Sequence, residues 1–173
     1  MNEVMKAILT RRSIRKFTDQ PIPEDVMKDI VAAALHAPSG MGKQTWQFTV
    51  ITNKEVIDRL IKTIGEARNA PDYNMYNPTA IILPTNITDG PWSKEDNACA
   101  LENIFLAAHS YGVGSVWINQ MQSLNNHPAV RALLTELGVP ADHSVTGLAA
   151  LGYPAPDAPI RDIERIGKVV YVK

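Results

Sequence analysis

Residues 11–17, which read RRSIRKF, bring three arginines, one lysine and one serine into a single short stretch. Arginine offers a planar fork of donors that suits phosphate oxygens, and lysine adds a point charge. Ser13 adds a small hydroxyl donor of the kind that completes a phosphate shell. A run of cations is usually a solvated face, but this run follows a helical pattern, and binding residues concentrate on such connecting segments. The stretch therefore predicts a site for a phosphate or another anion.

A second stretch, HAPSGMGKQTWQF at residues 36–48, contains letters that look like a nucleotide P-loop. That motif needs a glycine where Ala37 stands and a serine or threonine where Gln44 stands, and it follows a strand rather than a helix. We therefore exclude a P-loop. The small residues Pro38, Ser39 and Gly40 remain, and they allow the backbone to approach a flat ligand closely. An ordinary helix-to-strand loop is the alternative interpretation.

The other reactive side chains show no catalytic or metal-binding spacing. None of the four histidines is spaced like a metal ligand, so no metal is expected. Cys99 lies in an alanine-rich helical pattern and is expected to be a small buried apolar residue. Asp96 and Glu102 are six residues apart and fall on different faces of that helix. No side chain is therefore predicted to do covalent chemistry.

Length and composition are those of a soluble globular chain. Its 173 residues suit one domain with a real core, with 45% of the residues apolar and 20% charged. A formal charge of −1 argues against a nucleic-acid binder, and the single cysteine fits a reducing compartment, which we expect to be the cytoplasm. No apolar run approaches the roughly 20 residues that span a bilayer. We therefore expect one domain over residues 1–173, without a nucleic-acid or membrane partner.

The elements that must position these residues follow from apolar spacing. Five helices are predicted: over residues 2–10, after Pro23, from a capping box at Thr52 and Glu55, over 93–111 and over 128–138. The first has an apolar face made of Val4, Met5, Ile8 and Leu9. The helix over 93–111 is rich in alanine and leucine and is expected to be the hub of the core.

Five strands are predicted, over residues 46–51, 79–83, 113–118, 145–151 and 169–172. Helices and strands intermix without a strict β-α-β rhythm, which favours an α+β fold with a central mixed or antiparallel sheet of about five strands flanked by helices. The proline-rich segment after residue 152 predicts an extended C-terminal arm over about 153–173. Its strand has no hairpin partner beside it in sequence, so we expect the arm to reach a neighbouring copy.

Four stretches in this order carry a resemblance: RRSIRKF, APSGMGKQTWQF, DNACALENIFLAAHSYGVGSVWI at 96–118 and GLAALGYPAP at 147–156. Together they resemble the nitroreductase family of flavoproteins in its short form, over nearly the whole chain. The resemblance implies an α+β fold, an intertwined homodimer, and flavin mononucleotide (FMN) at the subunit interface, contacted by both chains. It also implies hydride transfer from NADH or NADPH to the flavin, followed by reduction of nitroaromatics, quinones or related small electrophiles.

The resemblance assigns roles to single residues at the phosphate end of the cofactor. Arg11, Arg12 and Ser13 match the phosphate and ribityl contacts of the family. Arg161 in the C-terminal arm matches a second phosphate-binding arginine, and Arg165 lies close enough in sequence to compete for that role.

At the ring end, Arg15 matches the cation that faces the N1/O2 edge of the flavin, where reduced flavin concentrates negative charge. Pro38, Ser39 and Gly40 match the segment that the partner subunit lays along the ring. Asn119 falls where the family places a backbone amide at flavin N5, and Asn74 is aligned with the pyrimidine edge. The resemblance implies no catalytic side chain, because the flavin carries the chemistry.

Two departures from the family pattern and three alternatives remain. Gly42 stands where the family has asparagine, and Thr45 where it has proline, so the resemblance does not extend to the contact of that asparagine with the ring. The chain also lacks room for the long insertion of larger members, which predicts an open pocket with weak selectivity.

The alternatives to a general reductase are a flavin carrier or sensor, a flavoenzyme with a dedicated substrate, and a nucleic-acid module that uses its basic stretch.

Overall fold

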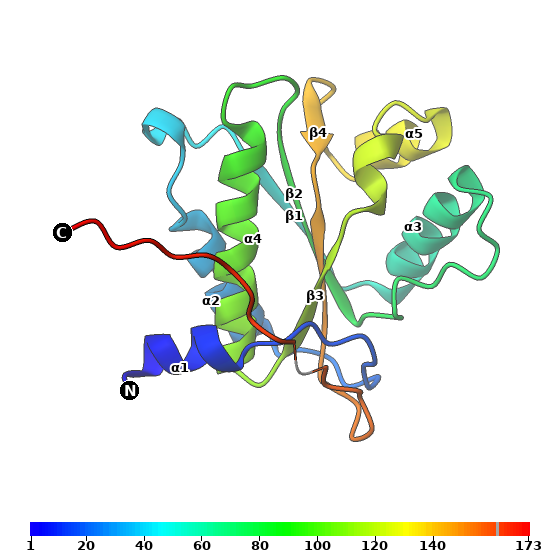
Figure 1. Cartoon of the computed structure of the whole chain (residues 1–173). Helices are drawn as coiled ribbons and strands as arrows, with labels where there is room; N and C mark the ends of the chain where they lie inside the picture. The colour runs from blue at the N-terminus through cyan, green and yellow to red at the C-terminus, as the bar shows by residue number, and fades with distance from the viewer. Residues whose placement is uncertain (162) are drawn as a thin grey trace.

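The computed structural model describes residues 1–161 and 163–173, which form a five-stranded sheet between two layers of helices (Figure 1). The strands are β1 (Gln47–Ile51), β2 (Ala80–Ile87), β3 (Gly114–Ile118), β4 (His143–Val145) and β5 (Leu148–Gly152). Their order is β1-β2-β5-β3, β4 pairs with the C-terminal end of β2, and every pairing is antiparallel. The predicted α+β fold is confirmed.

The five predicted helices form close to their expected places. They are α1 (Glu3–Thr10), α2 (Glu24–Leu35), α3 (Lys54–Ala67), α4 (Ser93–Ser110) and α5 (Pro128–Glu136), with short 3-10 turns η1 (Gly40–Gly42) and η2 (Gln120–Leu124). The predicted capping box at Thr52 is wrong by one residue. Asn53 caps α3, because its side-chain oxygen accepts from the N–H of Val56 at 3.1 Å.

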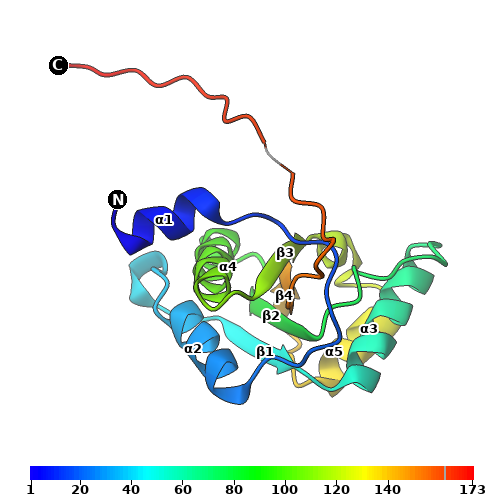
Figure 2. The same cartoon turned by 90° about the horizontal axis from the view of Figure 1, so that it is seen from below.

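The core lies on both faces of the sheet, and β2 shows why. Its residues alternate, so that Ile81 and Leu83 pack in the cluster of α3 and α5, while Ala80 and Ile82 pack in the cluster of α2 and α4. Figure 2 shows these two pairs of helices on opposite sides of the strands. All of β5 is buried, which explains its mostly apolar sequence.

Helix α4 is the hub of the second cluster, as predicted. Its buried residues include Asn97, Leu101 and Ile104, and it packs against α1, α2 and the sheet. Cys99 lies about 200° around the helix from Asn97. It is exposed, so the prediction of a buried cysteine is wrong.

Two predicted strands differ in the structure of the single chain. The strand expected over 145–151 is divided into β4 and β5 by a bend at Thr146 and Gly147. Residues 169–172 form no strand, because no free sheet edge lies beside them, and Tyr171 is 84% exposed. The apolar face of α1 is uncovered, with none of the helix residues buried. Among the described residues, no helix is long and apolar enough to cross a membrane.

Candidate functional site

Residues 11–17, here called the strap, leave the end of α1 and cross one end of the sheet (Figure 1). Backbone hydrogen bonds hold the strap on both flanks. The N–H of Ile14 donates to Ser115 O at 2.9 Å, and Lys16 O accepts from the N–H of Ala155 at 3.0 Å. The strap is therefore fixed between β3 and the segment that follows β5, and its polar side chains keep a defined order.

Two glycines allow the strap to lie flush on the sheet. A Cβ added to Gly114 would lie 2.9 Å from Ile14 Cβ, and one added to Gly152 would lie 2.9 Å from Phe17 Cβ. Real Cβ atoms do not approach so closely, so a larger residue at either position would lift the strap. Ile14 is 7% exposed and turns into the core, whereas Arg15 is exposed.

A cavity of about 310 Å³ lies at the N-terminal end of the strap. Arg11 and Arg12 form one side of it, and Pro156 and Ile160 of the C-terminal arm form another. Arg11 Nε is buried and makes no hydrogen bond among the described residues, although it lies 3.7 Å from Glu102 Oε1 of α4. A buried guanidinium nitrogen without a hydrogen bond is costly, so this position favours an anionic ligand.

Arg12 and His109 complete the polar side of this cavity. Arg12 Nη1 donates to Leu9 O at 2.7 Å and to Arg11 O at 2.8 Å, which caps the C-terminal end of α1. The Thr10 hydroxyl donates its hydrogen to Lys6 O. His109 Nε2 lies 2.8 Å from the Thr10 hydroxyl oxygen, so the histidine is the donor in the contact between Thr10 and His109. Burial, followed by the charges of Arg11 and Arg12, lowers the pKa of His109 below its ordinary value.

At the other end of the strap, Arg15 faces a strained turn. The Arg15 guanidinium carbon lies 5.9 Å from the centre of the Tyr76 ring, within cation–π range. Met75, Tyr76 and Asn77 all have left-handed backbone angles, with φ values of 49°, 64° and 49°. Asn74 holds this turn, because its Oδ1 accepts from the N–H of Tyr76 at 2.9 Å. The group that Asn74 can still offer to a ligand is therefore its amide NH₂, a donor.

Asn119 directly follows the last residue of β3, so its backbone N–H lies at the end of that strand. That N–H donates to Oε1 of the neighbouring Gln120 at 3.1 Å, so an acceptor already lies where a ligand nitrogen is predicted. The indole N–H of Trp117 donates to Asn119 Oδ1 at 3.3 Å. Trp117 also packs flush on Gly147, where a Cβ would lie 2.6 Å from the indole ring. The turn after β3 is therefore well anchored.

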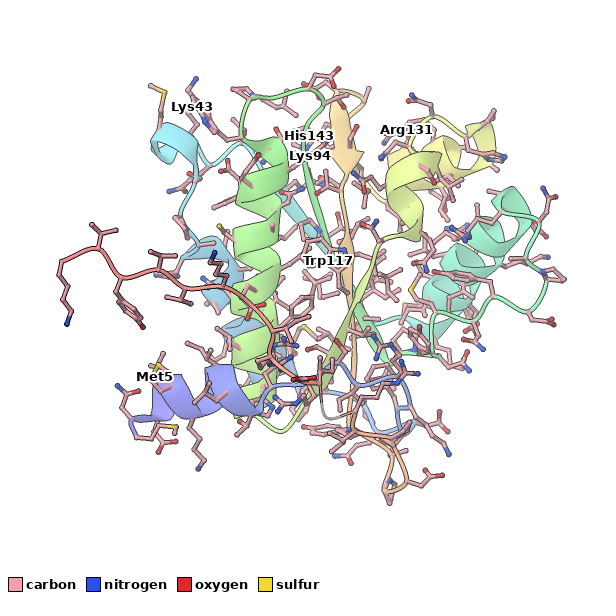
Figure 3. All side chains as sticks on the ribbon, in the orientation of Figure 1. Met5, Lys43, Lys94, Trp117, Arg131 and His143 are labelled. Atoms are coloured by element: carbon pink, nitrogen blue, oxygen red, sulfur yellow. The ribbon has the colours of Figure 1, made fainter. Side chains whose placement is uncertain are left out.

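Pro38, Ser39 and Gly40 do not join these residues within one chain. Their loop packs on the first turn of α4, where the N–H of Gly40 donates to Asp96 Oδ1 at 2.8 Å. Asp96 and His109 are 13 residues apart on one helix, which corresponds to about 20 Å. In both views α4 lies between this loop and β3, and Figure 3 shows Lys43 of the loop far from Trp117 of β3.

A sequence model named "Nitroreductase family" matches residues 8–75 and 62–153. The chain belongs to the nitroreductase family. A crystal structure of a nitroreductase with bound FMN from Bacteroides fragilis has 36% sequence identity to this chain and a TM-score of 0.93, with all of both chains covered.

Two curated relatives show the range of this family. A protein of Methanothermobacter thermautotrophicus, described as a candidate NADH dehydrogenase/NAD(P)H nitroreductase, is 32% identical over 165 residues, or 93% of this chain and 82% of its own. An iodotyrosine deiodinase of Nematostella vectensis is 24% identical in an alignment that covers 94% of this chain and 71% of its own.

In this nitroreductase-family chain, the residues predicted at the two ends of a cofactor lie along one path. Ser13 forms a bridge with Ser115 in β3, and Asn119 follows four residues later, about 13 Å along an extended strand. Arg161 follows Ile160 of the cavity wall, while Arg165 lies further along the exposed arm. Arg11 Nε, which has no hydrogen bond among the described residues, lies at the start of this path and fits an anionic group such as a phosphate.

Sequence reasoning missed four residues that shape this site. Tyr76 lies against Arg15, Gln120 occupies the Asn119 N–H, and Trp92 and Asp96 hold the Gly40 backbone. Tyr76 and Gln120 carry no pattern that distinguishes them from ordinary loop residues. The partnership of Gly40 with Trp92 and Asp96 joins positions more than 50 residues apart, so local spacing contains no signal for it.

Proposed function

We propose that this protein is an FMN-dependent oxidoreductase that uses NADH or NADPH to reduce nitroaromatics, quinones or similar small electrophiles. The observation that carries the proposal is the path from Arg11 and Ser13 on the strap to the backbone N–H of Asn119. The part of this path that runs along β3, from Ser115 opposite Ser13 to Asn119, is about 13 Å long and suits an extended ribityl chain that leads to a flavin ring. The B. fragilis relative with the same fold contains FMN.

FMN, when bound, supplies the redox chemistry by accepting two electrons and a proton from the nicotinamide and passing them to the acceptor. The chain then provides binding and electrostatics. Arg11, Arg12 and Ser13 hold the phosphate, together with Arg161 or Arg165 from the arm. Arg15 would place a fixed positive charge beside the N1/O2 edge of the flavin, and Asn74 would donate a hydrogen bond from its amide at the pyrimidine edge. The Asn119 N–H, which donates to Gln120 Oε1 in this chain, would donate to flavin N5 instead.

We propose further that the working unit is a homodimer with two composite sites. The strap and the Pro38–Gly40 segment are separated by α4 in one chain, so the segment can border a flavin only in a second copy. The exposed apolar face of α1 and the exposed apolar residues of the arm, among them Ile166 at 86% and Val172 at 93%, supply the surface for this contact. The domain over 1–173 then ends in an arm, about 153–173, that crosses to the partner.

The visible spectrum and a turnover assay test the proposal together. The purified protein is expected to be yellow, with one FMN per chain. It is also expected to oxidise NADH or NADPH when a nitroaromatic or a quinone is added. Bound flavin that dithionite reduces but neither nicotinamide reduces would identify a carrier instead. A colourless protein with strongly salt-dependent DNA affinity would contradict any flavin function.

A reaction with a dedicated substrate is a second candidate, and the iodotyrosine deiodinase relative favours it. On one fold, different substrates are accommodated by changes at the site rather than in the scaffold. Turnover of a halogenated aromatic at a rate well above that of nitroaromatics and quinones would select this candidate.

We place either reaction in a reducing compartment such as the cytoplasm, because the single cysteine is exposed.

A further inference from the structure

The loop over residues 38–45, here called the α4 loop, is held on its own chain by contacts that the family resemblance does not assign. We propose that Trp92 and Asp96 are positioning residues. They hold the backbone of the α4 loop in the shape that borders the flavin of a second copy. This inference rests on the proposed function, because it concerns the segment assigned to the composite site.

Asp96 supplies a polar clamp. Its Oδ1 accepts from the N–H of Gly40 at 2.8 Å, and the residue is only 6% exposed. A carboxylate so poorly solvated needs a donor, and a hydrogen bond to an ionised group is stronger than one between neutral groups. The contact therefore fixes Gly40 relative to the first turn of α4.

Trp92 supplies an apolar clamp at the same residue. A Cβ added to Gly40 would lie 2.4 Å from Trp92 Cδ2 and 2.5 Å from Cγ, so the Gly40 backbone packs directly on the indole ring. Lys43, three residues later, places its Nζ 5.7 Å from the centre of the same ring. Gly40, at the start of η1, and Lys43, which follows η1, therefore both contact one side chain that comes from outside the loop.

The remaining contacts leave one group of the loop ready for a ligand. The Ser39 hydroxyl oxygen accepts from the N–H of Gln44 at 3.2 Å, which leaves its hydrogen to donate elsewhere. The Thr45 hydroxyl donates to Asn86 Oδ1 at 2.7 Å and fixes the far end of the loop to β2. The Ser39 hydroxyl is a suitable donor for a flavin carbonyl oxygen.

The clamp explains how this chain manages without the asparagine and proline of the family pattern. Gly42 has a φ of 64° and Met41 a φ of 54°, so η1 contains two left-handed residues, and Met41 is 78% exposed. A segment with glycine at positions 40 and 42 has many alternative conformations. Contacts from outside the loop, at Trp92 and Asp96, restrict these alternatives.

The test compares matched variants of the full-length protein. Asp96→Ala is expected to speed FMN release roughly tenfold, which is the size of one charge-assisted hydrogen bond. Trp92→Ala removes the ring that packs on Gly40 and is expected to speed FMN release as well. Both should also speed tryptic cleavage after Lys43. Asp96→Asn keeps an acceptor oxygen, and Trp92→Phe keeps an aromatic ring, so both are expected to stay within about threefold of the wild type, again by the size of the lost interaction. The unfolding midpoints of the FMN-free proteins report whether each variant folds.

A double variant separates positioning from a general effect on stability. Gly40→Ala places a methyl group against the indole ring and releases the same clamp as Trp92→Ala. The pair together should therefore release FMN no faster than the more severe single variant. Additive effects, an Asp96→Asn variant as impaired as Asp96→Ala, or unchanged FMN release in both alanine variants would overturn the inference.

Failure of the proposed function gives a different result. A wild-type protein that does not bind FMN contradicts the function, whatever the clamp variants do. A protein that binds FMN and loses it in Arg11→Ala, but keeps it unchanged in Trp92→Ala and Asp96→Ala, contradicts only the positioning role.

Discussion

Arg11→Ala tests the phosphate end of the site, and its effect can be estimated from the structure. The Arg11 side chain is 25% exposed, and its Nε is buried without a hydrogen bond among the described residues. A charge-assisted bond from such a group to a phosphate oxygen is worth about 1.5–3 kcal/mol, or roughly 10- to 150-fold in the FMN dissociation constant. We expect a weakening of this size with little change in the unfolding midpoint of the FMN-free protein.

Two other variants serve as controls in the same titration, which follows flavin fluorescence as the protein is added. Lys16→Ala removes a cation from the same strap, but this cation pairs with Asp157 and is 52% exposed, so FMN affinity should change less than about twofold. Glu102→Gln removes the carboxylate that lies 3.7 Å from Arg11 and should tighten FMN binding. Equal effects of Arg11→Ala and Lys16→Ala, or weaker binding in Glu102→Gln, would refute a phosphate contact at Arg11.

Three further outcomes are expected. Arg15→Gln should lower the midpoint potential of the bound flavin, because the reduced ring loses a nearby cation; an unchanged potential in a spectroelectrochemical titration would remove this role for Arg15. A chain ending at Pro159 keeps the contact between Lys16 and Asp157 but loses the exposed arm, and it should sediment as a monomer and bind FMN poorly; a truncated dimer with full FMN would contradict the swapped arm. Because the pKa of His109 is lowered from 6.5, the unfolded state binds more protons just below that pH, so the unfolding free energy should fall as pH drops through 6.5. Chemical denaturation across this range should show a smaller fall in His109→Gln, and equal falls would argue against this cause.

The fold was predictable where one chain contains the whole signal. Alternating apolar and polar residues placed β1, an apolar run placed β2, and the alanine- and leucine-rich pattern at 93–111 identified the central helix. The strand predicted over 169–172 was expected to pair with a neighbouring copy, and in the single chain these residues form no strand. Apolar residues indicate that a segment can pair, but a strand also needs a neighbour, and no neighbouring edge is available in the single chain. The same reasoning applies to α1, whose apolar face was predicted correctly but remains uncovered.

The site was predictable only in part. The cation run identified the strap because its chemistry is local in sequence, and the family resemblance added Asn119 and the α4 loop. Neither revealed that Arg15 lies against Tyr76 or that Gly40 packs on Trp92, since these contacts join residues far apart in sequence. The strained turn at residues 75–77 could not be predicted either, because the sequence Met-Tyr-Asn does not indicate three consecutive residues with left-handed backbone angles.

Subunit mixing tests the composite site most directly. One partner carries Arg11→Ala with Ser13→Ala, which disables the strap, and the other carries Gly40→Val, which disables the α4 loop. If the loop serves the second copy, a mixed dimer has one site with both parts intact and one with both parts damaged. Purified mixed dimers are then expected to bind one FMN with wild-type affinity, while each parent dimer binds FMN weakly. If strap and loop serve the same flavin within one chain, no intact site forms, and mixed dimers that bind no better than their parents would contradict the account.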